Sequence, residues 1–216
     1  MKDRTWAIVG PLTGIVFVVL LVLSVGISGS VRDDIDDSIT STSSAEAANV
    51  LADRRDQVRI GSTIGLFGLL FFFGFLAYFR SRLQQAEGEG GWLTSMAYGG
   101  GLVSAAVMLV FISLDLATTA VSDYGPDTQV AKTLIALQWR YLWVLAPPMI
   151  AFTLGASLVI VRYAALPRWI GWIGFPVAVT LFIPWIGFPV AVAWVLVVSI
   201  ALLIQAGRTP QPKEAN

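Results

Sequence analysis

The stretch Ile60-Gly-Ser-Thr-Ile-Gly-Leu-Phe-Gly-Leu-Leu-Phe-Phe-Phe-Gly-Phe-Leu-Ala-Tyr-Phe79 contains no charged residue and is bounded by Arg59 and Arg80. A helix of about 20 apolar residues crosses the hydrocarbon core of a bilayer, which is about 30 Å thick. The stretch therefore has the length and the composition of a transmembrane helix.

Four other runs are almost free of charge, and they cover 6–28, 93–114, 141–161 and 169–204. The last run has about 36 residues, or roughly 54 Å of helix at ~1.5 Å per residue, so it predicts two spans with a turn between them. We therefore expect an all-α integral membrane bundle of six transmembrane helices in a single domain, 1–216. The expected spans cover about 6–28, 60–79, 93–116, 141–161, 168–184 and 188–206, with an outer loop at 29–59.

The composition excludes several classes of protein. Of 216 residues, 56% are hydrophobic and 13% are charged, and 14 basic residues balance 14 acidic ones. No basic block is present, so nothing favours nucleic-acid binding. The absence of cysteine and histidine removes disulfides, thiol nucleophiles, histidine metal ligands and Ser-His-Asp triads. The lysines lie outside the expected spans, where they cannot hold retinal, and we expect no metal and no cofactor.

The first apolar run has an alternative interpretation as a cleaved signal peptide. Such a signal has an apolar core of about 7 to 15 residues followed by small residues. Small residues do follow at Ser28 and Gly29, but the run 6–28 is longer than a signal core. We therefore expect it to remain as the first transmembrane helix.

The basic residues predict the orientation, because Lys and Arg favour cytoplasmic loops, above all short ones. With both termini inside, the inner segments hold Lys2, Arg4, Arg80, Arg82, Arg162, Arg168, Arg208 and Lys213. The outer segments then hold Arg32, Arg54, Arg55, Arg59, Lys132 and Arg140, most of them in the long acidic outer loop. We therefore expect a protein of the inner membrane with both termini in the cytoplasm.

The outer loop divides into two parts. Arg32-Asp-Asp-Ile-Asp-Asp37 is polar and is expected to be extended. Ser43 and Glu46 have the spacing of a capping box, and apolar residues follow at near-helical spacing, so 45–57 is predicted to be a short outer-surface helix before the second span. The carboxylates at 33–37 are of the type that binds divalent cations. They lack the glycine and the terminal glutamate of a calcium loop, so a solvated acidic loop is the simpler interpretation.

The sequence Trp-Ile-Gly-Phe-Pro-Val-Ala-Val occurs twice, at 172–179 and at 185–192. It is too short for a repeat fold and is interpreted as a local duplication. Each copy places a tryptophan four residues before a proline. Trp185 and Pro189 are therefore predicted to form the outer turn of the last hairpin, with Trp169 and Trp172 at the inner interface.

Asp115 is the one acidic residue that touches an apolar run, and an ionisable residue in a span is by default a functional hypothesis. A count from Leu93 puts it near the outer boundary, and a count back from Arg162 puts Arg140 at a similar level. We therefore predict an ion pair between Asp115 and Arg140 at the outer face. It is either a structural pair that holds two helices together or a site that handles a solute or a proton.

Small residues spaced as in the GxxxG motif allow close helix contacts in membranes. The pairs are Gly10 with Gly14, Gly61 with Gly65, and Gly101 with Ala105. They are predicted to pack helices within one chain, and a face for homo-oligomerisation is the alternative.

Leu166-Pro-Arg-Trp-Ile-Gly-Trp-Ile-Gly174 resembles a box in a bacterial family of uncharacterised multi-pass membrane proteins, where a Leu-Pro-Arg-Trp-Leu-Gly-Trp-Leu-Gly sequence enters the penultimate helix. The segments Leu51-Ala-Asp-Arg-Arg-Asp-Gln57 and Tyr78-Phe-Arg-Ser-Arg-Leu83 are also similar. The resemblance covers most of the chain in layout, but the duplicated segment departs from it. It implies a six-helix bundle and no activity, cofactor or catalytic residue.

Three functions remain open. The first is a non-enzymatic inner-membrane protein that acts by helix packing or by binding a membrane-protein partner within the lipid bilayer, because no reactive set of side chains is present. The second is a small transporter or channel, which needs polar groups along a path near the midplane. The third is a membrane enzyme with Asp115, Arg140 and Tyr141 at the outer face, although three polar groups do not define a reaction.

Overall fold

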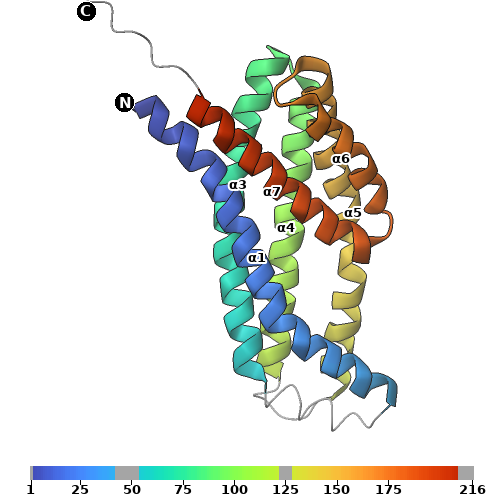
Figure 1. Ribbon diagram of the computed structural model, residues 1–216. Coiled ribbons are helices and arrows are strands. Elements are labelled where there is room, and N and C mark those ends of the chain that lie inside the picture. The colour runs from blue at the N-terminus through green and yellow to red at the C-terminus, as the bar shows by residue number, and fades with distance from the viewer. Residues whose placement is uncertain (1, 42–53, 122–127, 209–216) are drawn as a thin grey trace, which may run out of the picture.

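The computed structural model describes residues 2–41, 54–121 and 128–208, which form six α-helices and no strand (Figure 1). The helices are α1 (Lys2–Ser41), α3 (Arg55–Glu87), α4 (Trp92–Val121), α5 (Thr128–Tyr163), α6 (Arg168–Thr180) and α7 (Pro184–Arg208). All of them except α6 are long and apolar enough to cross a membrane. The all-α prediction is confirmed for the described residues, whereas α6 is shorter than the predicted span 168–184.

Consecutive helices run in opposite directions along the bundle. α1 packs against α3 and α7, α4 lies between α3 and α5, and α6 packs on α5. The start of α1 and the end of α7 therefore lie at the same end of the bundle (Figure 1). We call this the terminal end, and we call the opposite end, where α3 and α5 begin, the distal end.

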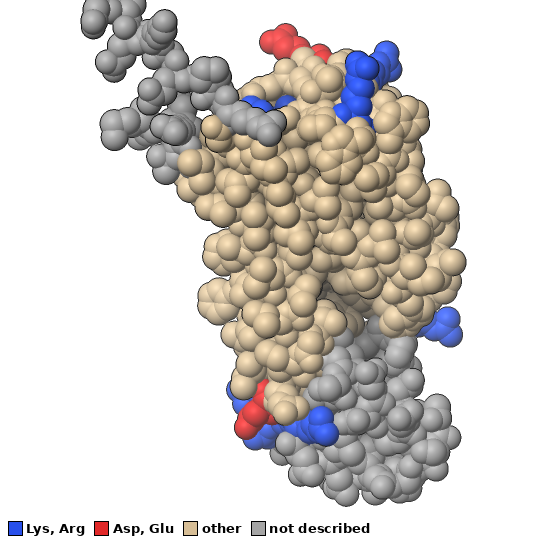
Figure 2. Space-filling model, in the orientation of Figure 1, with Lys and Arg blue, Asp and Glu red and all other residues tan. Residues whose placement is uncertain are grey.

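Charged side chains gather at the two ends of the bundle and leave an uncharged band between them on the face shown in Figure 2. Two helices measure the height of this band. At about 1.5 Å per residue, the distance along α3 from Arg59 to Arg80 is about 32 Å, and the distance along α5 from Arg140 to Arg162 is about 33 Å. Both values match the thickness of a hydrocarbon core, which is about 30 Å.

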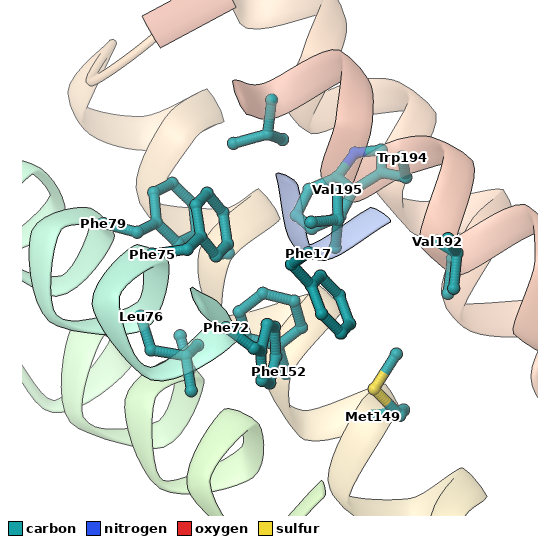
Figure 3. Packing of buried hydrophobic residues seen from close by; sticks show 14 of the residues in the cluster. Phe17, Phe72, Phe75, Leu76, Phe79, Met149, Phe152, Val192, Trp194 and Val195 are labelled. Carbon is teal, nitrogen blue, oxygen red and sulfur yellow. The ribbon is translucent and has the colours of Figure 1, made fainter. Parts of the chain in front are cut away.

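An aromatic cluster fills the interior of the bundle, and its members are Phe17, Phe72, Phe75, Phe79, Phe152 and Trp194 (Figure 3). Phe152 of α5 is the central ring, because it lies 6.3 Å from Phe72, 6.2 Å from Phe79 and 5.9 Å from Trp194, each with its plane near perpendicular. Edge-to-face rings of this kind attract one another beyond their area of contact. The cluster thus joins α1, α3, α5 and α7.

Small residues let the helices approach closely around this cluster. Gly10 lies against Tyr78, Gly14 against Phe75 and Ser199, Gly61 against Ser24 and Ser28, Gly65 against Ser24 and Ile112, and Gly101 against Leu76 and Phe152. Ala105 is fully buried. The five glycines of the predicted GxxxG-type pairs therefore lie at contacts between helices of one chain.

A close approach of two helix backbones joins α4 and α5, at glycines that the GxxxG spacing does not identify. A Cβ on Gly100 would lie 2.5 Å from the Phe152 nitrogen and 2.6 Å from the Pro148 oxygen. A Cβ on Gly155 would lie 2.8 Å from the Ala97 nitrogen. The two helices therefore touch main chain to main chain at this crossing, as small residues permit in membranes.

Several loop predictions need correction. Residues 32–37 are helical, because α1 continues without a break to Ser41. Each residue added to an existing helix gains one hydrogen bond, and no proline occurs after Pro11 in α1 to stop it. The first part of the expected outer loop 29–59 is thus helical as far as Ser41. Of the predicted surface helix 45–57, residues 45–53 lie outside the described residues, and Arg55 to Gln57 belong to α3.

The turn of the last hairpin lies earlier than predicted. α6 ends at Thr180, residues 181–183 form the turn, and α7 begins at Pro184, so Trp185 and Pro189 lie within the first two turns of α7. The reason is Pro184, which favours the first position of a helix because it has no amide to leave unpaired. The two duplicated segments consequently lie on two different helices.

The close α4–α5 crossing leads to a test with a neighbouring glycine as control. We expect Gly100→Ala to lower the stability of the folded protein by about 1 to 3 kcal/mol, because the added methyl forces the two backbones apart. Gly99 has nothing within 4 Å of its Cβ position, so Gly99→Ala is expected to be neutral or stabilising by up to about 1 kcal/mol. Thermal unfolding in detergent measures both, and equal effects would contradict the crossing.

Candidate functional site

The strongest candidate site is a polar group of side chains on α4 and α5 near the distal end. Asp115 of α4 is only 5% exposed, and Thr118 and Thr119, one turn further on, are also buried. Tyr141 of α5 is buried as well, and its ring stacks on Phe111 at 4.3 Å, one turn before Asp115. A carboxyl group, two hydroxyls and a phenol therefore lie on facing sides of two neighbouring helices.

The two threonine hydroxyls of this site are already engaged by their own helix. Thr118 donates to the Leu114 carbonyl at 2.7 Å, and Thr119 donates to the Leu116 carbonyl at 2.7 Å. Asp115 also has an interaction with a partner. A buried carboxylate needs such a partner, because the loss of water penalises its charge.

Arg140 lies on the surface while Asp115 is buried, and no hydrogen bond or ion pair between the two is seen in the described part of the chain. The count along the two helices placed both residues at the distal end, but a count along a helix does not determine which way a side chain points. The pairing of Asp115 with Arg140 stays a prediction.

Three other buried hydroxyls in the bundle bond to the preceding turn of their own helix, whereas the Ser157 hydroxyl of α5 is buried without a hydrogen-bond partner. Ser104 donates to the Gly100 carbonyl, Thr153 to the Met149 carbonyl and Ser199 to the Val195 carbonyl, each at 2.8 Å. The hydrogen-bond donors of these three hydroxyls are therefore satisfied within single helices. They do not form a chain of free polar groups along a path, which a hydrophilic conduit requires.

A second cluster of hydroxyls lies between α1 and α3. Ser24 donates to the Gly61 carbonyl across the interface at 2.8 Å. The hydroxyl oxygens of Ser28 and Ser62 are buried without a hydrogen-bond partner. Serines beside small residues commonly hold membrane helices together, so this cluster is explained by helix packing.

Polar groups at the terminal end have structural roles. The predicted inner loop is largely helical, because α3 continues to Glu87 and only 88–91 form the turn. The Glu87 carboxylate accepts hydrogen bonds from the amides of Leu93 at 3.1 Å and Thr94 at 2.8 Å, and from the Thr94 hydroxyl at 2.6 Å. It thereby satisfies free amides at the start of α4, as a capping side chain does. Arg80 lies over the Tyr98 ring at 4.6 Å, which ties α3 to α4.

An open groove of about 540 Å³ also lies at the terminal end. Its lining residues all come from the end of α3 and the following turn, and they are Ala77, Arg80, Ser81, Gln84, Gln85, Gly88 and Glu89. One basic and one acidic side chain on a single helix surface do not define a site for an ion or a substrate.

The chemistry available at these sites is limited. The chain has no cysteine and no histidine, and no three acidic side chains gather in the described ranges in a way that would hold a metal ion. Asp115 is the one buried carboxylate among the residues whose side chains the structure describes. No known protein family, curated protein or solved structure matches this chain.

The burial of Asp115 leads to a stability test. We expect Asp115→Asn to destabilise the protein by about 1 to 3 kcal/mol, because a buried hydrogen bond to a charged group is left half-made. We expect Arg140→Gln to cost less than about 0.5 kcal/mol, because its side chain is exposed. Thermal unfolding of the two single variants and the double variant measures the coupling. If the double variant loses less stability than the two single variants added together, the pair is established. If the losses are additive, the partner of Asp115 lies elsewhere.

Glu87 leads to a pH-dependent test. Partial burial by itself would raise the pKa of Glu87. The hydrogen bonds from Thr94 and Leu93, together with the nearby charge of Arg162, outweigh this effect, so the pKa lies below its ordinary value of 4.5. The ionised carboxylate therefore stabilises the fold above pH 4.5, and this stabilisation is lost as the pH falls through the lower pKa of the folded state.

We accordingly expect Glu87→Ala to lower the stability by about 1 kcal/mol at pH 7, the usual effect of removing a cap. The difference between wild type and variant should shrink at pH 3 to 4. Melting curves at both pH values measure this, and Glu89→Ala is the control, because the Glu89 side chain is exposed and lies in the same turn. A difference that stays constant with pH would contradict the cap.

Proposed function

We propose that this chain is a non-enzymatic, multi-pass protein of a bacterial inner membrane, which acts through helix packing or through binding a partner within the bilayer. The observation that carries this proposal is the interior of the bundle. The aromatic cluster fills it, and the buried hydroxyls of Ser104, Thr153 and Ser199 bond to their own helices. Such an interior suits a rigid scaffold better than a conduit or an active site.

We propose further that the terminal end faces the cytoplasm. The helix ends and short turns there carry Arg80, Arg82, Arg162 and Arg168, and arginines in short segments have the strongest effect on orientation. Exposed tryptophans near both ends support the membrane position itself. Trp92, Trp169 and Trp172 lie near the terminal end and Trp143 near the distal end, as in the interfacial belts of membrane proteins.

Single cysteines test this orientation, because the natural chain has none. Ser81 at the terminal end and Thr133 at the distal end are both exposed. We expect a membrane-impermeant maleimide to label Thr133→Cys in intact spheroplasts and Ser81→Cys only after lysis. The reverse pattern would overturn the orientation.

A second candidate function is the handling of a proton or a small solute at the distal end. It is favoured by the burial of Asp115 beside Thr118, Thr119 and Tyr141, since ionisable residues inside spans often mark ion pathways. The absence of histidine and of a second buried carboxylate in the described ranges makes a proton relay incomplete.

Proton flux separates the two candidate functions. Proteoliposomes are loaded with a pH-sensitive dye, and a potassium diffusion potential is imposed on them. We expect the rate of acidification inside them to lie within about twofold of the rate in protein-free liposomes. We expect Asp115→Asn to change nothing, because the carboxyl is structural. If the proton flux is well above the background and Asp115→Asn abolishes it, the scaffold proposal is wrong and the second function takes its place. Gly99→Ala serves as the matched variant for reconstitution, since it touches neither the polar site nor a helix contact.

A further inference from the structure

The turn between α6 and α7 has the side chains of a segment in lipid. Leu181, Phe182 and Ile183 are all apolar, and no charged residue occurs between Arg168 and Arg208. Large apolar side chains around this turn are more than half exposed, and they are Val179, Phe182, Ile183, Trp185 and Ile186. The α3–α4 turn at the terminal end differs, because it holds Glu89 between two glycines with positive φ.

The backbone of this turn is also suited to an environment without water. The amides of Leu181, Phe182 and Ile183 donate to the carbonyls of Val177, Val179 and Thr180, at 3.3, 3.2 and 2.9 Å. Pro184 has no amide hydrogen, and the amides of Ile186 and Gly187 both donate back to the Ile183 carbonyl. The Thr180 hydroxyl donates to the Val177 carbonyl at 2.7 Å. Hydrocarbon tolerates a turn only when its polar groups are paired within the protein in this way.

The depth of the turn follows from its register against α5. Gly174 of α6 lies against Ser157 of α5. Leu181 lies about 10 Å further along α6, and Arg140 lies about 25 Å from Ser157 along α5, at about 1.5 Å per residue. Leu181, where the turn begins, therefore lies about 15 Å short of the level of Arg140, near the middle of a core about 30 Å thick. In Figure 1 the turn lies above the distal end of α5, which begins at Thr128.

The lengths of the two helices agree with this depth. α6 has 13 residues, or about 20 Å of helix, which is too short to cross the core. α7 has 25 residues, but it runs obliquely across the bundle (Figure 1), so part of its length lies along the membrane. The indole nitrogen of Trp194 in α7 donates to the Ile170 carbonyl of α6 at 3.1 Å, which holds the two helices together.

We infer that α6 and α7 form a re-entrant hairpin. It enters the bilayer at the terminal end, turns within the hydrocarbon and returns to the same end, with the exposed side chains at 179–186 in contact with lipid acyl chains. The chain then crosses the membrane four times, through α1, α3, α4 and α5, and both termini still lie on one side. The inference requires only that the bundle lies in a bilayer, and it holds for a scaffold and a transporter alike.

Spin-label accessibility tests the depth of the turn. Phe182→Cys, carrying a nitroxide label, is reconstituted into lipid nanodiscs as full-length protein, because Phe182 is 68% exposed and the label displaces no core contact. Leu70→Cys is the matched control at the membrane centre, since Leu70 is 64% exposed and lies midway between Arg59 and Arg80. Ile60→Cys, at a position 54% exposed beside Arg59, is the control at the distal boundary.

We expect the Phe182 label to behave like the Leu70 label, with frequent collisions with oxygen and few with a water-soluble nickel chelate. A label at Phe182 that collides with nickel as often as the Ile60 label would show that the hairpin crosses the membrane, and would overturn the inference. Low accessibility to both reagents with dipolar broadening would place a second copy of the chain on the turn, and would overturn lipid as its partner. If the Leu70 control itself is accessible to nickel, the membrane position of the whole bundle is wrong.

Discussion

The structure depends on one constraint, which is that no water reaches the backbone inside a bilayer. Every amide and carbonyl in the hydrocarbon must therefore find its partner within the protein, and helices achieve this within a single segment. The arginines within α3 and α5 fit this constraint, because they leave about 32 to 33 Å of helix between them without a charge. The loops follow the same rule. The α3–α4 turn lies outside the apolar band and carries Glu89, whereas the α6–α7 turn pairs its amides internally and carries apolar side chains.

In lipid, apolar side chains gain little from leaving the solvent, so close packing and hydrogen bonds must hold the helices together. Two devices do this here. Phe152 contacts aromatic rings of α3 and α7 at the centre of the bundle, and Gly100 and Gly155 bring the backbones of α4 and α5 into contact. The resulting interior is filled by rings and methyl groups. This is the physical reason for preferring a scaffold or a partner-binding protein to a conduit.

Asp115 is the group that fits this picture least well. Burying a carboxylate is costly, and chains retain such a group when it stabilises a particular arrangement or when it takes part in function. Its neighbours Thr118 and Thr119 are bonded to α4 itself, and Tyr141 of α5 is buried with its ring stacked on Phe111, one turn before Asp115. Two polar side chains from two helices can stabilise a helix pair, but they do not by themselves move a solute.

The amino-acid sequence by itself determined the helical class, the apolar runs and the levels of the arginines, because hydrophobic length and charge act through composition along one segment. It also identified Gly10, Gly14, Gly61, Gly65, Gly101 and Ala105 as candidates for helix contacts. Only the tertiary structure decided what depends on rotation and register between segments. Arg140 and Asp115 lie near the same end of the bundle, yet one faces outward and the other is buried, because depth does not specify the face of a helix. Likewise, an apolar run as long as 169–204 is compatible with a full crossing or with a shallow hairpin, and it was the contact of Gly174 with Ser157 that set the depth of the turn.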